Sequence, residues 1–487
     1  MEQIVIPPVN LALIAPLLTV VAWATVLLLV DVFAIPTNNK KLTGYLAIAG
    51  LIVAGLVAIP LWNLPPDSTF SGMVRHDPYA LTLTWIFLVV GIISIIMALD
   101  YLPRQGIEQG EFYALVMFAV GGMILMAQSA DLIVLFLALE TLSITLYILT
   151  GFAYPRLTSE EAAMKYLILG AFAAGFFVYG IALIFGATGT TNLTAIGEVA
   201  LQVVGGDPTL LLLGAGMVLI AFAFKVALVP FHMWTPDVYE GSPTPVAAFM
   251  SVGTKGAALA ALLRIFTEAL GPLETLWLPV LSGLAALTMI VGNLGALAQL
   301  NVKRMLAYSS VGHAGYILLG VIVASDRGAQ SFLFYMLAYA LTNLGAFAVV
   351  IALEQRGELA WSLDDFNGLF QRRPMLAVAM AVFMFSLAGV PPTAGFMAKF
   401  YVFTAAYEGG LGWLALIGVL TSAVAAFFYL RVVVRMFMQE PLRDVDPELN
   451  RGLSFDIGLT AIATMLIGLI PTPVIFLVER SLVAAGS

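Results

Sequence analysis

The sequence predicts an all-α polytopic membrane protein. Of its 487 residues, 61% are hydrophobic and 10% are charged, whereas soluble domains are about 45–50% apolar and about 25% charged. Apolar runs of about twenty residues recur along the chain, and each can cross a hydrocarbon core of ~30 Å. The longest polar stretches, 187–208 and 354–374, have only the length of loops. Residues 1–487 are therefore predicted to form a single membrane domain.

Hydropathy and helix breakers divide the chain into about fourteen transmembrane helices. Three N-terminal helices lie within 9–100, and one C-terminal helix covers 455–478. The seventh helix breaks at Pro230, and the glycines and prolines of GVPPTAG (389–395) divide the twelfth. The predicted spans are residues 9–34, 42–63, 77–100, 111–128, 131–152, 160–187, 208–229, 245–267, 274–299, 303–324, 328–354, 374–406, 410–435 and 455–478.

The loop lysines and arginines predict the orientation of these helices. Thirteen fall on one side of the membrane and four on the other. Because cytoplasmic loops carry an excess of basic residues, the richer side is predicted to be cytoplasmic, with both termini on the outer side of the cell (inner) membrane. The thirteen are Lys40, Lys41, Arg104, Arg156, Lys303, Arg304, Arg356, Arg372, Arg373, Arg431, Arg435, Arg443 and Arg451, and the four are Arg75, Arg264, Arg327 and Arg480.

Two short sequence matches indicate an internal repeat. Residues 224–230 and 385–391 share Phe, Ala, Val and Pro at the same spacing, and YILTG (147–151) matches YILLG (316–320). In each pair the two segments lie five spans apart. Because five is odd, equivalent helices cross the membrane in opposite directions, as in transporters built from inverted repeats.

The common offset predicts two inverted five-helix repeats, at 111–267 and 274–435, with helices seven and twelve as the broken members. In such folds the transport site lies near mid-membrane beside the broken helices.

The residue types that are missing bear on redox chemistry. The chain has no cysteine, so it can form no cysteine-ligated iron–sulfur cluster and no CxxCH haem attachment. Its three histidines, His76, His232 and His313, are too far apart for a local metal motif. We therefore expect no cofactor in this chain, and expect any redox chemistry to occur in a partner.

One acidic residue, Glu140, is predicted to lie deep in the membrane. It follows Asp131 by nine residues, which places it ~13 Å along its helix. A charge at that depth costs at least ~2.5–3.5 kcal/mol and normally faces a partner or a water-filled cavity. Glu140 is thus a candidate proton carrier, and the alternative is a structural salt bridge between helices.

Lysine is the only basic residue type assigned to the interior of the predicted spans. Lys165, Lys225, Lys255 and Lys399 are placed there, whereas the arginines within the span limits, Arg264, Arg304, Arg431 and Arg435, are counted with the loops at the span ends. Burial favours the neutral form of a lysine and a nearby carboxylate favours the charged form, whereas arginine does not release its proton. This preference indicates proton handling. Lys165 lies only a few residues past Glu161, so snorkelling to the surface partly explains it.

The helix breaks suggest where such lysines exchange protons. A helix interrupted at Pro230 leaves backbone groups that must be satisfied by protein or water, so a hydrated pocket is expected beside Lys225. The same argument applies to Lys399, close to Pro391 and Pro392.

Two histidines are further candidates. His313 lies about ten residues into its span, between the Lys255 and Lys399 elements in chain order. It is read either as a proton relay or as a satisfied packing residue. His232, at the break, is a less certain candidate to line a cytoplasmic entrance. For the neighbouring Asp237 and Glu240, loop capping and proton collection both remain open.

Three blocks of sequence carry a family resemblance. FKVALVPFHMWTPDVYEGSPTPVAAFMSVGTKGAA, SSVGHAGY and LAGVPPTAGFMAKFYV resemble the N-type antiporter-like subunits of respiratory complex I, the proton-pumping NADH:quinone oxidoreductase. The likeness covers essentially the whole chain. By motif, Glu140, Lys225, Lys255 and Lys399 match that family's glutamate of helix five and lysines of helices seven, eight and twelve.

The resemblance implies a non-redox subunit of a proton-translocating enzyme. Such a subunit binds neither NADH nor an iron–sulfur cluster, and it moves protons while quinone is reduced in other subunits. Its expected partners are the membrane-arm subunits M and K and the lipid bilayer, and no nucleic acid.

Three alternatives stay open at this point. The chain could be an Mrp-type Na⁺/H⁺ antiporter subunit, although the block around Trp234 argues against it. It could belong to the relatives in photosynthetic membranes that accept electrons from ferredoxin. It could also be a scaffold that anchors the membrane arm without transporting protons.

Overall fold

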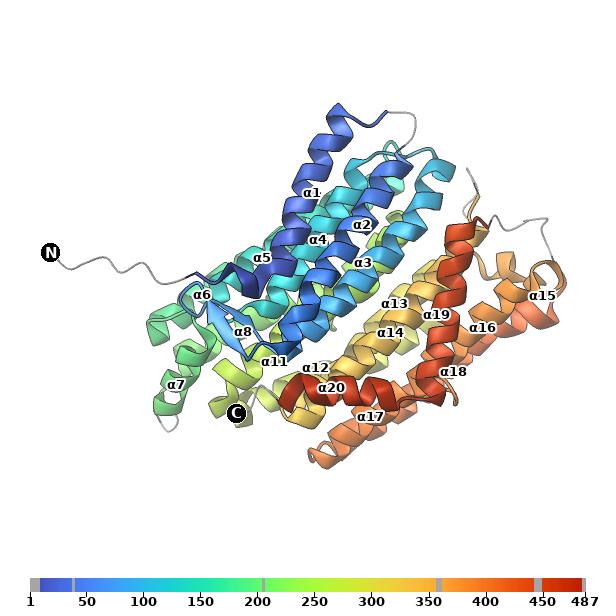
Figure 1. Ribbon diagram of the computed structural model, residues 1–487. Helices are drawn as coiled ribbons and strands as arrows, with labels where there is room; N and C mark the ends of the chain where they lie inside the picture. Colours follow the sequence, from blue (N-terminus) through green and yellow to red (C-terminus); the bar gives the residue numbers. More distant parts are fainter. Residues whose placement is uncertain (1–8, 37–39, 204–205, 356–360, 442–448, 484–487) are drawn as a thin grey trace.

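A bundle of long helices makes up the protein (Figure 1). The computed structural model describes residues 9–36, 40–203, 206–355, 361–441 and 449–483. In this part of the chain, thirteen helices are long and apolar enough to cross a membrane. The remaining predicted span, the twelfth, is divided into two shorter helices, so the polytopic helical fold is confirmed. Arg356 and Arg443, both counted in the orientation argument, lie outside the described residues.

The first half of the chain contains the helices up to and including the one that follows the first break. It also contains a short β-hairpin that the sequence did not predict. In chain order these elements are η1 (Leu11–Ile14), α1 (Ala15–Phe33), α2 (Lys41–Ala58), η2 (Ile59–Asn63), β1 (Asp67–Thr69), β2 (Val74–His76), α3 (Pro78–Gln105), α4 (Glu111–Gln128), α5 (Leu132–Thr150), α6 (Leu157–Thr188), α7 (Leu193–Val203), α8 (Thr209–Val226) and α9 (Trp234–Gly241). The antiparallel hairpin pairs Asp67 with His76.

The second half begins with a span that contains two π-helical segments, η3 and η4. Its elements are α10 (Thr244–Phe249), η3 (Met250–Thr254), α11 (Lys255–Arg264), η4 (Ile265–Ala269), η5 (Gly271–Leu273), α12 (Glu274–Leu297), α13 (Val302–Ile322), α14 (Asp326–Leu353), η6 (Leu363–Phe366), α15 (Leu369–Arg372), α16 (Pro374–Ala388), α17 (Ala394–Glu408), α18 (Gly412–Met438), α19 (Arg451–Leu469) and α20 (Thr472–Val483).

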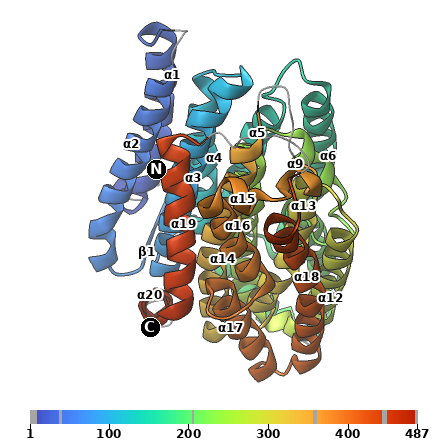
Figure 2. The same cartoon turned by 90° about the vertical axis from the view of Figure 1, so that its right-hand side faces the viewer.

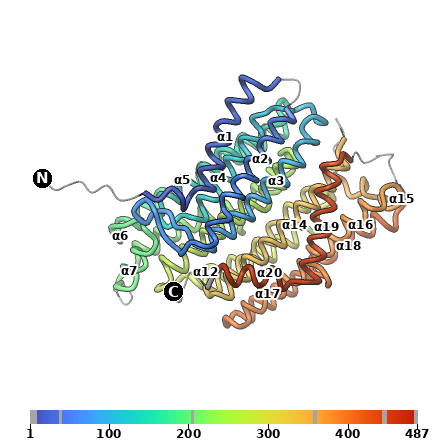
Figure 3. The backbone as a smooth tube through the Cα atoms, viewed as in Figure 1, coloured from blue at the N-terminus to red at the C-terminus, as the bar shows by residue number. Residues whose placement is uncertain are grey.

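The two halves lie side by side with their long helices roughly parallel (Figure 3). A second view places α1 and α2 along one side of the bundle and α6, α12 and α18 along the other (Figure 2). We call the end where α2 and α13 begin and where α3 and α14 end the basic face. Arg104, at the end of α3, reaches the Ile351 carbonyl near the end of α14 at 3.0 Å and so ties these ends together.

Two helices depart from the predicted pattern. The polar stretch 187–208 contains the amphipathic helix α7, which buries Leu193, Ile196 and Ala200 against η4. The predicted span 455–478 is also wrong at its end. Helix α19 stops at Leu469, because Pro471 cannot continue the hydrogen-bond ladder. The chain then turns into α20, which lies across the bundle in Figure 1.

Both predicted helix breaks are present, between α8 and α9 and between α16 and α17. Each begins at a residue in the left-handed region, Ala227 (φ 65°) and Gly389 (φ 85°), whose N–H caps the preceding helix. A proline follows three residues later in both. The backbone therefore matches Pro230 with Pro392, one residue away from the Pro391 of the sequence alignment. The division into repeats at 111–267 and 274–435 stays a prediction.

Helices α6 and α8 approach each other through glycines. A Cβ on Gly214 would lie 2.9 Å from the Gly180 carbonyl oxygen and 2.8 Å from a side-chain carbon of Ile184. Small residues of this kind let membrane helices pack backbone to backbone. The close approach fixes α8, whose last turn carries Lys225.

Gly214→Ala is expected to destabilise this packing by about 1–3 kcal/mol, because a methyl group forced into a filled contact separates the helices. The measurement is the temperature at which the purified complex loses this subunit. Gly216→Ala is the matched control on the same helix, since a Cβ there meets nothing within 4 Å. Equal midpoints for the two variants would show that the glycine contact does not determine stability.

Candidate functional site

Glu140 and Lys225 form the first part of the site. Lys225 is 3% exposed, and its Nζ donates hydrogen bonds to Ser143 Oγ at 2.9 Å and Tyr166 Oη at 3.0 Å. Glu140, one turn before Ser143 on α5, has a buried Oε1 without a hydrogen-bond partner. The two charges interact electrostatically, but in the described part of the chain no ion pair within 4.0 Å joins them. The ammonium group is therefore held by neutral hydroxyls beside an unpaired carboxylate.

An aromatic wall closes the first break over Lys225. The Tyr166 ring stacks on the Trp234 indole at 4.6 Å and 13°, and Lys225 Nζ lies 5.2 Å from the Tyr166 ring centroid. Trp234 begins α9, and its Nε1–H donates to the Phe224 carbonyl of α8 at 2.9 Å. The Tyr166 hydroxyl and the two stacked rings therefore enclose the Lys225 ammonium group.

The backbone groups freed by the first break find partners in the protein itself. Besides the Trp234 contact, the Val229 N–H donates to Thr288 Oγ1 of α12 at 2.9 Å. Non-helical backbone within the membrane needs hydrogen-bond partners for its N–H and C=O groups, and here the protein itself provides them. The hydrated pocket expected beside Lys225 stays a prediction.

Lys255 lies at the junction between η3 and α11. It is 1% exposed, and its Nζ donates to the Ser310 carbonyl of α13 at 2.7 Å. The Tyr239 ring centroid is 6.0 Å from Nζ. π-helical turns often mark functional sites, and here the turn ends at the buried lysine.

His313 lies one turn beyond Ser310 on α13. Its Nδ1 is 2.8 Å from Tyr335 Oη and its Nε2 is 3.1 Å from Tyr429 Oη. A neutral imidazole donates from one nitrogen and accepts at the other. His313 therefore joins two tyrosine hydroxyls, an arrangement that suits both readings left open by the sequence.

Lys399, on α17, faces the second break. Its Nζ donates to the Leu387 and Ala388 carbonyls, each at 3.0 Å, and lies 5.0 Å from the Tyr316 ring centroid. These are the last carbonyls of α16, which the break leaves without helical partners. A Cβ on Gly389 would lie 2.9 Å from Lys399 Cδ, so glycine leaves room for the lysine stem.

Aromatic rings connect the separate lysines into one buried line. Trp234 contacts Tyr239 at 6.2 Å, so Tyr166, Trp234 and Tyr239 lead from Lys225 towards Lys255. The helices that hold Lys225, Lys255, His313 and Lys399 pack in the same order. Helix α8 contacts α11, α11 contacts α13, and α13 contacts α17.

Beyond Lys255 the connection runs through α13, where Ser310, the acceptor for Lys255, lies one turn before His313. Tyr316 lies edge-on to His313 at 5.6 Å and under the Lys399 ammonium. The five principal predicted residues thus belong to one buried polar line, which we call the lysine line: Glu140, Lys225, Lys255, His313 and Lys399.

The less certain candidates lie outside the lysine line. The Lys165 side chain is 42% exposed and pairs with Glu161 at 2.6 Å and Asp237 at 3.1 Å. Arg304 bridges Asp237 and Glu240, with both contacts at 2.8 Å. Asp237 and Glu240 are therefore members of an ion-pair cluster on the surface.

His232 is not a member of the lysine line as defined above, although it interacts electrostatically with Lys255. Its ring is half-buried beside Tyr308, with the two centroids 6.5 Å apart. This position places it within the loop of the first break.

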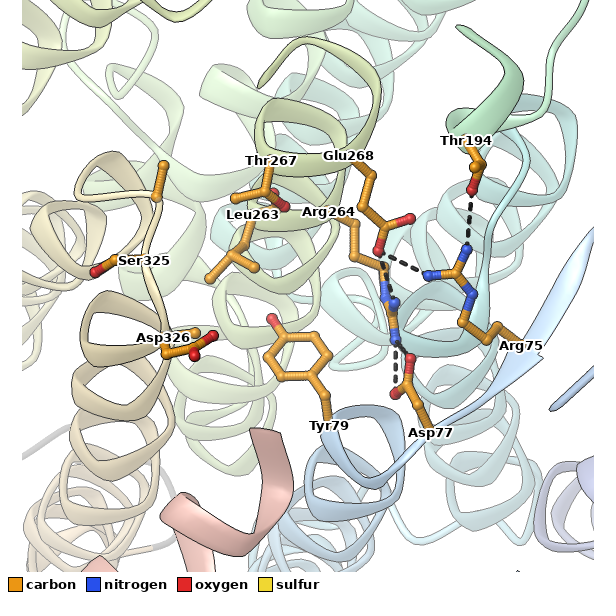
Figure 4. Close-up of a pocket in the computed structure, with 12 residues that line it drawn as sticks. Arg75, Asp77, Tyr79, Thr194, Leu263, Arg264, Thr267, Glu268, Ser325 and Asp326 are labelled. Carbon is orange, nitrogen blue, oxygen red and sulfur yellow. Dashed lines mark hydrogen bonds and ion pairs between the residues drawn. The ribbon is translucent and has the colours of Figure 1, made fainter. Parts of the chain in front are cut away.

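The face opposite the basic face holds a cavity of about 520 Å³ at the C-terminal end of α11 (Figure 4). Arg264, counted above as a loop residue, is buried there and binds both oxygens of Asp77, at 2.6 and 2.8 Å. Glu268 joins Arg264 to Arg75, with contacts of 3.1 and 2.9 Å. This network fixes the end of the helix that begins with Lys255.

A second buried charge pair, not predicted from the sequence, lies near the basic face. Lys303 was assigned to a loop and Glu354 to a span end, yet both are fully buried. Asp456, near the start of α19, is also buried, and neither of its carboxylate oxygens has a hydrogen-bond partner. One feature of the sequence does indicate that Lys303 belongs to a helix and not to a loop. Asn301 is a favourable N-cap residue, which places Lys303 in the first turn of the helix.

Among the described residues, no group of three or more His, Cys, Asp or Glu side chains is placed to hold a metal ion.

Comparison with known proteins places this geometry in a family. Residues 129–425 match the family model described as NADH:quinone oxidoreductase/Mrp antiporter, TM. NADH-quinone oxidoreductase subunit N of Chloroflexus aggregans is 74% identical over the full length of both chains. A chain of respiratory complex I from Thermus thermophilus is 34% identical with a TM-score of 0.81, over 94% of this chain and 98% of that one.

An Mrp complex gives a second structural match. A chain of the complex from Dietzia has a TM-score of 0.83 over 98% of this chain and 97% of that one, at 21% identity. At that identity the likeness extends to the fold alone.

Proposed function

This chain belongs to the NADH:quinone oxidoreductase/Mrp antiporter family, among its subunits N, and from that premise we propose that it moves protons along the lysine line while quinone is reduced in other subunits. It is a multi-pass membrane subunit of the complex I type. We assign it no electron-transfer step. In this proposal the proton is the cargo, and the electron donor and quinone belong to other chains.

One observation carries the proposal: the buried lysines are held by neutral acceptors. Lys225 donates to two hydroxyls, Lys255 to a carbonyl and Lys399 to two carbonyls. A lysine locked to a carboxylate stays charged, whereas a desolvated lysine among neutral acceptors can lose its proton. Glu140, close to Lys225 but not bound to it, supplies a charge that can tune this release.

The proposal also covers the orientation of the subunit in the membrane and its neighbouring subunits. The basic face is assigned to the cytoplasm and both chain ends to the outer side of the cell membrane, from the distribution of basic residues. Subunits M and K are the proposed neighbours. The strong identity to subunit N favours this function over an Mrp-type Na⁺/H⁺ antiporter, for which only the shared family model and the fold argue.

Lys255→Met is expected to lower proton pumping by at least about tenfold, since a positioned proton-transfer group typically contributes ~10²–10⁴-fold. The measurement is NADH-driven proton uptake into sealed inverted vesicles, normalised to NADH–ferricyanide activity, which bypasses the membrane arm. Lys41→Met, which removes a charge from the surface of the basic face, is the control and should pump normally.

Two outcomes of this experiment would count against the proposal. Normal pumping by Lys255→Met in a complex with full subunit content would favour the scaffold alternative. Pumping by the unmodified complex that stops in sodium-free medium would favour sodium antiport.

A further inference from the structure

Lys303 and Glu354 form a second buried carboxylate–lysine pair, at the basic-face end of the helix that carries Lys255. Both residues have 0% exposure. Lys303 Nζ donates to the Ser242 carbonyl at 2.7 Å and lies 4.2 Å from the Trp361 ring centroid. Glu354 Oε1 accepts from Thr244 Oγ1 at 2.5 Å and from Trp361 Nε1 at 2.8 Å.

This pair repeats the arrangement of Glu140 and Lys225. In both, the ammonium group is held by a neutral acceptor and an aromatic ring. In both, one carboxylate oxygen is buried without a hydrogen-bond partner, Oε1 of Glu140 and Oε2 of Glu354. Lys303 and Glu354 interact electrostatically, and in the resolved stretches around them no ion pair within 4.0 Å is formed. A purely structural pair would gain most from direct contact.

A cavity of about 340 Å³ brings solvent close to this pair. It is lined by the ends of α3 and the loop before α6, including Tyr101 and Arg156. Arg156 also lies against the Trp361 ring, 5.2 Å from its centroid. Tyr101 lines the cavity, its hydroxyl is buried without a hydrogen-bond partner, and it interacts electrostatically with Glu354. Tyr101 is therefore the residue of the cavity wall that couples to the carboxylate.

Polar groups continue from the pair towards Lys255. Thr244, bound to Glu354, begins α10, which runs through η3 to Lys255 eleven residues later, a rise of ~16 Å. Along this stretch Asn343 Nδ2 donates to Ser251 Oγ at 2.6 Å. Ser310 Oγ donates to the Ser251 carbonyl at 3.4 Å, and the Ser310 carbonyl holds Lys255.

We propose that Glu354 and Lys303 are proton-transfer residues that take protons from the cavity beside Tyr101 and Arg156 and pass them towards Lys255. This inference rests on the proposed function, because it supplies an entry to the lysine line. In each transfer a proton leaves one acceptor and binds the next, and no other bond changes.

The test uses Glu354→Gln in the whole complex. An amide oxygen can still accept from Thr244 and Trp361, so the hydrogen bonds are kept while the carboxylate is lost. We expect NADH-driven proton uptake per electron to fall at least about tenfold at normal NADH–ferricyanide activity. Asp364→Asn, which removes an exposed carboxylate paired with Arg435 at 3.0 Å, is the matched control and should pump normally.

A double variant separates proton transfer from a structural role. Lys303→Met combined with Glu354→Gln removes both charges together, which a structural pair tolerates. We expect the double variant to stay as defective as Glu354→Gln. Normal pumping by the double variant would overturn the inference and make the pair a structural contact.

Comparison with Glu140→Gln distinguishes a failure of the proposed proton entry from a failure of the proposed function. If Glu140→Gln loses pumping and Glu354→Gln keeps it, the entry is wrong and the lysine line stands. If both variants pump normally, the proposed function itself is overturned.

Discussion

Glu140→Gln is expected to lower coupled proton pumping at least about tenfold in a complex that still assembles, which is among the largest losses we expect from a single substitution. Glu140 Oε1 has no hydrogen-bond partner, so replacing the carboxylate with an amide removes the charge without breaking a bond there. Lys225 would keep its contacts with Ser143 and Tyr166. It would lose the carboxylate that favours its protonated form, and burial would then favour the neutral amine.

The measurement is the rate of NADH-driven acidification of sealed inverted vesicles, and the expected loss is at least about tenfold. Glu140→Asp should be milder, since the charge survives with a shorter reach. Glu274→Gln, an exposed glutamate at the start of α12, controls for the loss of a carboxylate. If assembled Glu140→Gln complex pumps normally, Glu140 has no part in loading Lys225.

Lys225→Arg is expected to impair pumping as severely as Lys225→Ala. Arginine keeps the positive charge and could bind the Glu140 carboxylate with two hydrogen bonds, so a static counter-ion would survive this substitution. Arginine does not release its proton, because its pKa exceeds ~12. The neutral partners of Lys225 favour release. The measurement is vesicle acidification as above, with subunit content checked by gel.

The sequence was sufficient for the spans and for the breaks, because each depends on local chemistry. A run of apolar residues must cross the membrane, and proline with glycine interrupts a helix at a defined place. Helix α7 was missed because its apolar residues alternate with polar ones in a stretch too short to span. The turn into α20 was missed because hydropathy continues past Pro471 although the helix does not.

The position of a residue within a predicted span identifies some parts of the site and not others. Glu140, Lys225, Lys255 and Lys399 stand out because they interrupt long apolar runs. The aromatic rings that connect them do not stand out, since aromatic residues are common throughout these helices.

The burial of Lys303 and Glu354 could not be predicted from the sequence, because it depends on a contact between distant segments. The loop after α14 returns to the start of α13, where the Val302 N–H donates to the Trp361 carbonyl at 2.6 Å. Asn301 and Ser362 form a β-bridge beside it. This return places Trp361 over Lys303 and buries a lysine that a count of span residues assigns to a loop.

The number of protons taken up per electron by the Lys225→Arg complex tests the central claim most directly. The claim is that buried lysines of this chain release and rebind the transported protons. Sealed vesicles energised by NADH give the proton count, and NADH–ferricyanide activity corrects for the amount of assembled enzyme. The account predicts a ratio as low as that of Lys225→Ala. A ratio equal to that of the unmodified complex would contradict it, because Lys225 would then be a fixed counter-ion outside the proton path.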